Sequence, residues 1–65
     1  MPIPTLENPL IVGDIVRVVN VYDCDGNFSV GDELVVTIAT SSGVAVNGHG
    51  NQTWMAGRFE LVRRP

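Results

Sequence analysis

The sequence has 65 residues, with seven acidic side chains against four arginines and a formal net charge of −3. A chain of this length forms one domain near the lower size limit for independent folding, which leaves little depth for an internal active site. The acidic balance disfavours general binding to nucleic-acid phosphates, and no run approaches the ~20 apolar residues that a membrane span requires. The single cysteine, Cys24, excludes an internal disulfide, so we expect a cytoplasmic protein.

Proline dominates the start of the chain. Residues 1–11 contain Pro2, Pro4 and Pro9, which lack a backbone donor and have a fixed φ. This composition is typical of an extended segment rather than of a strand inside a sheet. We therefore expect an extended N-terminal arm over residues 1–11 and one folded domain over residues 12–65.

Short runs of β-branched residues follow, separated by segments rich in Gly, Asp, Asn and Ser. β-Branched side chains are stiff in helices and pack well on a pleated surface, whereas the intervening residues favour turns. Apolar residues do not recur at helical spacing. The expected strands span residues 15–21, 33–40, 44–46, 52–55 and 59–62, with one 3₁₀ turn at 56–58.

One motif occurs twice, each time directly before a strand. Val12-Gly13-Asp14 precedes the first strand and Val30-Gly31-Asp32 precedes the second. Glycine supplies a turn conformation that is closed to other residues, and the aspartate can accept a hydrogen bond from the turn backbone. A flat sheet of this size would leave two open edges and an uncovered face. We therefore predict an all-β fold, a small five-stranded SH3-like barrel with an extended proline-containing N-terminal arm.

The core of this barrel is expected to come from one face of each strand. The predicted core residues are Val16, Val18, Leu34, Val36, Ile38, Val44, Val46, Trp54, Phe59 and Leu61.

Several segments of the chain resemble small SH3-like proteins encoded in bacteriophage and prophage genomes. The segments are residues 13–19, 28–32 and 43–46, Trp54, and the ending Arg58-Phe59-Glu60-Leu61-Val62. The resemblance extends over residues 12–62 and implies an SH3-like barrel in a phage-type accessory protein, with no particular activity. The proline-rich arm and the Ser41-Ser42-Gly43 connection depart from the usual pattern.

The sequence lacks a convincing catalytic or metal-binding set. An EF-hand calcium loop that started at Asp23 would require glycine and glutamate where Phe28 and Leu34 stand. His49 has no neighbouring nucleophile in the sequence, and one histidine with one cysteine cannot form a usual zinc site. Cys24 lies between two aspartates, whose charge opposes thiolate formation. We expect no enzymatic activity, no cofactor and no metal.

The most consistent functional expectation is a non-enzymatic protein-interaction module that docks on a host or phage protein. Loops carry recognition on small scaffolds. The candidate contact residues are Tyr22, Asp23, Asp25, Asn27, His49, Trp54 and Arg58. Two alternatives remain open, namely a nucleic-acid-binding barrel that uses Trp54 and the arginines, and a homo-oligomeric structural subunit joined through strand edges. The sequence leaves open whether Trp54 belongs to the core or to an exposed aromatic platform.

Overall fold

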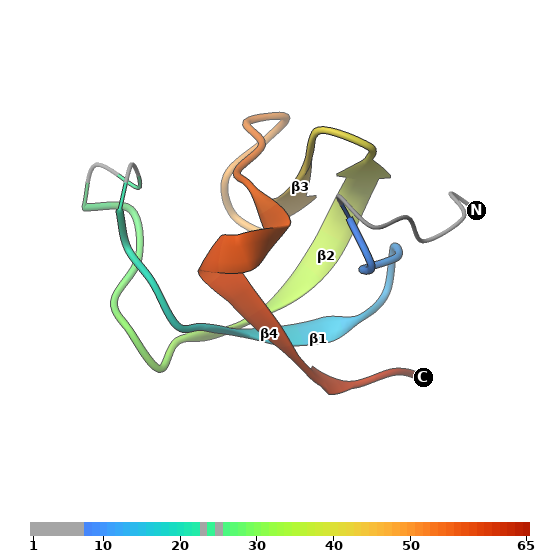
Figure 1. Cartoon of the computed structure of the whole chain (residues 1–65), viewed down its shortest axis with the longest axis horizontal. Coiled ribbons are helices and arrows are strands. Elements are labelled where there is room, and N and C mark those ends of the chain that lie inside the picture. Colours follow the sequence, from blue (N-terminus) through green and yellow to red (C-terminus); the bar gives the residue numbers. More distant parts are fainter. Residues whose placement is uncertain (1–7, 23, 25) are drawn as a thin grey trace.

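The computed structural model describes residues 8–22, 24 and 26–65. Its elements are β1 (Ile15–Val18), β2 (Glu33–Thr40), β3 (Gly43–Val46), the 3₁₀ turn η1 (Ala56–Arg58) and β4 (Phe59–Arg63). The strands form one antiparallel sheet in the order β3-β2-β1-β4 (Figure 1). The prediction of an all-β domain is confirmed, and η1 lies where the 3₁₀ turn was expected.

Strand β2 is the long element that connects the two ends of the sheet. Its first half pairs with β1, where Leu34 lies opposite Val16, and its second half pairs with β3, where Ile38 lies opposite Ala45. In Figure 1 this strand curves along its length. Strand β4 pairs with the other side of β1, with a register shift between Ile15 and Val16. β1 therefore lies between β2 and the last strand of the chain.

The predicted five-stranded barrel differs from the structure in strand number and in closure, because the described residues form an open sheet of four strands. The expected strand at 52–55 is reduced to a single bridge, in which the amides and carbonyls of Val44 and Trp54 exchange two hydrogen bonds of 2.8 Å. On one side of Trp54 the Gln52 amide donates to the His49 carbonyl within a turn, and on the other side Met55 leads into η1. The chain therefore turns on both sides of Trp54, so that no second residue pair forms next to the Val44–Trp54 bridge.

The repeated Val-Gly-Asp motif forms the same turn in both places, as the sequence predicts. Asp14 donates its amide to the Ile11 carbonyl and accepts the Ile11 amide on its carboxylate, at 3.1 and 2.9 Å. Asp32 and Ser29 make the equivalent pair of hydrogen bonds, both of 3.0 Å. The intervening Gly13 and Gly31 have φ values of 98° and 99°, a region that residues with a side chain rarely adopt. Each turn therefore ends where a strand begins.

The core lies on the inner side of the curved sheet and includes most of the predicted residues. The predicted residues that are buried are Val16, Val18, Val36, Val44, Val46, Trp54 and Phe59. Leu34 and Ile38 are half-buried and Leu61 is 45% exposed, so these three contribute less than expected. Phe28, which the sequence places in a loop, is buried with 6% of its surface exposed. Its ring packs edge-to-face on Trp54 and Phe59, with centroid distances of 4.7 and 5.7 Å.

A buried carboxylate connects the two ends of the described chain. The side chain of Asp14 is fully buried, and it accepts hydrogen bonds of 2.9 Å from Nε and Nη2 of Arg64. Arg64 also donates to the Pro9 carbonyl at 3.2 Å. Burial raises the cost of an unpaired charge, so this bidentate pair satisfies a group that would otherwise destabilise the fold. The hydrogen bond from Arg64 is the main cause that lowers the pKa of Asp14, against the opposing effect of burial.

Asp14→Asn is expected to weaken the dependence of stability on acid pH. Because the folded-state pKa of Asp14 lies below its ordinary value of about 3.9, the ionised group stabilises the fold above that pH, and this stability is lost as the pH falls through the lowered pKa. At neutral pH the variant should lose about 1–3 kcal/mol. Urea unfolding between pH 7 and pH 2 measures both effects. Arg64→Gln should flatten the same profile, and a profile that neither substitution changes would contradict the assignment.

Candidate functional site

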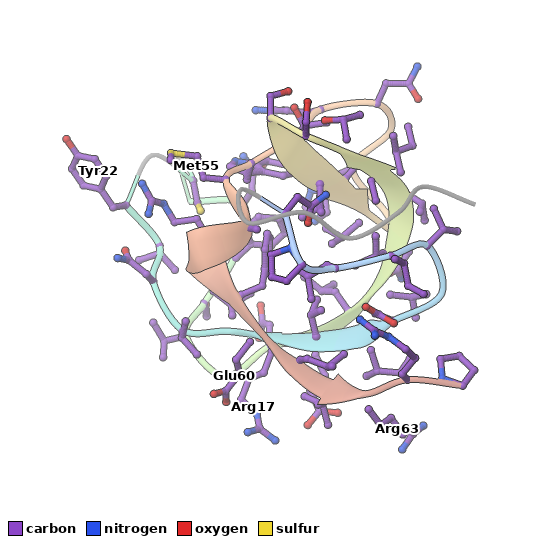
Figure 2. All side chains as sticks on the ribbon, turned by 45° about the vertical axis from the view of Figure 1, so that its right-hand side comes forward. Arg17, Tyr22, Met55, Glu60 and Arg63 are labelled. Carbon is purple, nitrogen blue, oxygen red and sulfur yellow. The ribbon has the colours of Figure 1, made fainter. Side chains whose placement is uncertain are left out.

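Two large apolar side chains project into solvent on the same side of the molecule. Tyr22 is 69% exposed and Met55 is 62% exposed, and Figure 2 shows both on the side away from Arg63. Tyr22 comes from the loop after β1, whereas Met55 directly precedes η1. Val19 and Val21, both about 40% exposed on the same loop, add apolar surface near Tyr22. We call the surface of Tyr22, Met55 and Arg58 the Tyr22–Met55 face.

The loop after β1 is attached to η1 by backbone hydrogen bonds. The sequence predicts that the first strand continues to residue 21, but the amides of Val19 and Asn20 instead donate to the Arg58 carbonyl, at 2.9 and 3.3 Å. The Asn20 side chain then accepts the Tyr22 amide at 2.8 Å, which closes a local turn. These contacts end β1 at Val18 and bring Tyr22 to the side of η1.

Arg58 contacts Tyr22 in two ways. Its Nε donates to the Tyr22 carbonyl at 2.7 Å, and its guanidinium carbon lies 5.3 Å from the centre of the Tyr22 ring. A guanidinium within ~6 Å of an aromatic ring is attracted by the ring quadrupole. Two of the sequence-predicted contact residues, 36 positions apart, are therefore adjacent in the structure.

A shallow hollow borders Met55. It has a volume of about 290 Å³ and is lined by Ser41, Ser42, Met55, Ala56 and Gly57. The two serines belong to the turn between β2 and β3, so the hollow lies between this turn and η1. A Cβ atom built on Gly57 would meet no atom within 4 Å, which shows that space is open above this residue. The hollow extends the apolar surface of the Tyr22–Met55 face.

Three of the remaining predicted contact residues are described, and each has a different environment. Trp54 is a core residue with 6% of its surface exposed, and its indole Nε1 is buried without a hydrogen-bond partner among the described residues. His49 is half-buried and packs on Phe28 at a centroid distance of 4.6 Å. Asn27 is exposed and donates its side-chain amide to the Cys24 carbonyl at 2.7 Å. Asp23 and Asp25 lie outside the described residues.

The outer side of the sheet near β1 and β4 has a different character. Arg17 donates to Glu60 at 3.0 Å and to Glu33 at 3.2 Å, and all three side chains are about half exposed. Exposed pairs of this kind contribute little stability and remain well hydrated. Figure 2 shows Arg17 and Glu60 at a distance from Tyr22 and Met55. The apolar surface around η1 is thus distinct from this charged row.

Sequence reasoning missed Met55 and the residues that line the hollow. The residues concerned are Ser41, Ser42, Met55, Ala56 and Gly57. The sequence pattern predicts a strand at 52–55 that includes Met55, and it predicts a turn at Ser41-Ser42-Gly43. The available signal was the glycine at position 57 after Met55-Ala56, because a residue without a side chain next to a short turn leaves surface space.

Wider features of the chain add three findings. Within the described ranges, no group of three or more His, Cys, Asp or Glu side chains is arranged to hold a metal ion. The same part of the chain contains no helix of the length and apolar character needed to cross a membrane. No protein-family model, curated protein or solved structure matches this chain.

Proposed function

We propose that this chain is a non-enzymatic protein-interaction module of the small phage-type accessory class, and that the Tyr22–Met55 face is its contact surface. The proposal includes an SH3-like fold in which one strand is reduced to the Trp54 bridge. This reading is supported by the strand order, by the bridge at the free edge of β3, and by the 3₁₀ turn directly before the last strand.

The carrying observation is that Tyr22 and Met55 are both highly exposed on the same side of the molecule (Figure 2), with Arg58 in contact with Tyr22. Tyr and Met are enriched in the buried centres of protein interfaces, and contiguous exposed apolar surface often marks an interaction site. The hollow of about 290 Å³ next to Met55 offers space for a side chain of a partner. Two of its lining residues, Ser41 and Ser42, carry hydroxyl groups that can form hydrogen bonds.

The partner that fits this surface is a segment of another protein. The chain carries a net charge of −3, and its described cations outside this face are Arg17, Arg63 and Arg64. Arg17 is paired with two glutamates and Arg64 with Asp14. A phosphate backbone would require clustered and accessible cations. Apolar contact with a polypeptide requires no such cations.

Gly57→Leu is expected to block binding without disturbing the fold. The new side chain would occupy the hollow, where an added Cβ meets no atom within 4 Å. Peptides selected from a displayed random library on the immobilised wild-type protein serve as the probe. Their affinity, measured by titration calorimetry, should fall at least about tenfold, which corresponds to about 1.4 kcal/mol. Tyr22→Ala should weaken the binding of the same peptides.

Arg63→Ala is the matched control, since Arg63 is exposed on β4 away from this face (Figure 2). It should retain wild-type affinity, and the urea midpoints of all three variants should remain close to that of the wild type. Failure to select any reproducible peptide would remove the proposal. Selected peptides that bind Gly57→Leu as well as wild type would place the contact surface elsewhere.

A further inference from the structure

One side chain connects η1 to both the backbone and the ring of Tyr22. Arg58 Nε donates to the Tyr22 carbonyl at 2.7 Å, and the same guanidinium lies over the Tyr22 ring at 5.3 Å. The other contacts that the structure describes around this loop act on the main chain, including that of Cys24 Sγ, which lies 3.7 Å from the same Tyr22 carbonyl. Asn20 accepts the Tyr22 amide, and the Arg58 carbonyl accepts the amides of Val19 and Asn20. Among these contacts, that of the guanidinium is the one that reaches the ring.

We propose that Arg58 is a positioning residue, which fixes the orientation of the Tyr22 ring before a partner arrives. The inference rests on the proposed function of the Tyr22–Met55 face and names the residue that prepares it. Arg58 is itself anchored, because it lies in η1 and its amide donates to the Met55 carbonyl at 3.0 Å. The same short turn therefore presents Met55 and orients Tyr22.

The expected consequence for binding is that the Tyr22 ring is already ordered in the unbound protein. A side chain that is 69% exposed would otherwise sample several rotamers, and a partner would have to immobilise it on binding. A planar guanidinium that holds the carbonyl and covers the ring reduces this freedom in the unbound protein. The cost of immobilising one such side chain corresponds to roughly a two- to tenfold change in affinity.

The first measurement concerns the free protein. Tyr22 is the single tyrosine of the chain, so its ring signals in NMR spectra can be assigned without ambiguity. Arg58→Met keeps the aliphatic stem and removes the guanidinium, and Arg58→Lys restores a charge without the planar group. We expect the Tyr22 side-chain order parameter to fall in Arg58→Met and to recover partly in Arg58→Lys. An unchanged order parameter in Arg58→Met would overturn the proposal.

The second measurement is a double-mutant cycle with Tyr22→Ala and Arg58→Met, using the library-selected peptides as probe. A positioning role predicts that Arg58→Met weakens binding two- to tenfold when Tyr22 is present and has no further effect when Tyr22 is alanine. Equal losses in both backgrounds would mean that Arg58 contacts the partner independently, which would overturn the proposal. If the wild type selects no peptide, the proposed function fails, and the order parameter alone decides whether Arg58 positions the ring.

Discussion

Phe28→Ala is expected to leave much of the protein unfolded at 25 °C. Phe28 is 6% exposed and lies at the centre of the aromatic cluster, where its ring contacts His49, Trp54 and Phe59. Truncation of a buried phenylalanine costs about 3–5 kcal/mol, because burial is lost and a cavity remains. A single core in a domain of this size supplies about 3–5 kcal/mol in total. The cost of the truncation is similar to the whole free energy of unfolding, so this free energy should fall to about zero.

Circular dichroism and urea unfolding measure this effect directly. Phe28→Leu is the control, since it keeps most of the apolar volume and should remain cooperatively folded with a lower urea midpoint. Trp54 fluorescence reports on the same cluster, because the indole packs against Phe28 at a centroid distance of 4.7 Å. A Phe28→Ala protein with wild-type stability would show that the cluster is not the centre of the core.

Gly43→Ala is expected to destabilise the fold by about 1–3 kcal/mol through steric overlap. A Cβ atom at position 43 would lie 2.5 Å from the Trp54 carbonyl oxygen and 3.1 Å from its carbonyl carbon. The obstructing atoms belong to the backbone, so a change of rotamer cannot relieve the overlap. The chain around Trp54 must then move away from β3, which breaks the paired hydrogen bonds with Val44.

Gly57→Ala makes the same chemical change where the added Cβ meets no atom within 4 Å. Its urea midpoint should equal or slightly exceed that of the wild type. Amide hydrogen exchange gives a local measurement, because the amides of Val44 and Trp54 should lose protection in Gly43→Ala and keep it in Gly57→Ala. Equal stability of the two variants would contradict a close approach of β3 and Trp54.

The strands could be predicted largely because local chemistry and tertiary packing agree. The run from Glu33 to Thr40 is rich in β-branched residues and forms β2 over the expected range. The two Val-Gly-Asp turns were also recognisable, because a glycine with positive φ and an aspartate that bonds the turn backbone are local properties. The structure differs from the prediction where contacts with distant segments of the chain determine where a strand ends. β1 stops at Val18 because the next amides donate to Arg58, which no local pattern could indicate.

The missing fifth strand and the buried Phe28 have a related explanation. Trp54 and its neighbours have suitable side chains for a strand, but pairing requires a partner over several residues, and the chain turns on both sides of Trp54. Phe28 follows Gly26 and Asn27, so its surroundings indicate a loop. The loop nevertheless directs one aromatic ring into the core. Burial of a single loop residue depends on the path of the loop, which sequence periodicity does not report.

The candidate site was predictable in part. Tyr22 and Arg58 were named from the sequence as residues for contact, and the structure places them next to each other. Met55 was not named, because an alternating strand pattern hides a side chain whose chain segment leaves the sheet after one bridge. The hollow depends on the approach of the Ser41-Ser42 turn to η1, and this approach is a property of the folded chain alone.

The pairing of β1 with β4 has a consequence for synthesis in the cell. Arg17 and Glu60 are 43 residues apart, and Asp14 and Arg64 are 50 apart, so both contacts close most of the chain into a loop. Such non-local pairings slow folding. On the ribosome, the sheet cannot be completed until β4 has left the exit tunnel. Until then Val16 and Val18, which are fully buried in the folded protein, lack their partners Leu61 and Phe59 on β4.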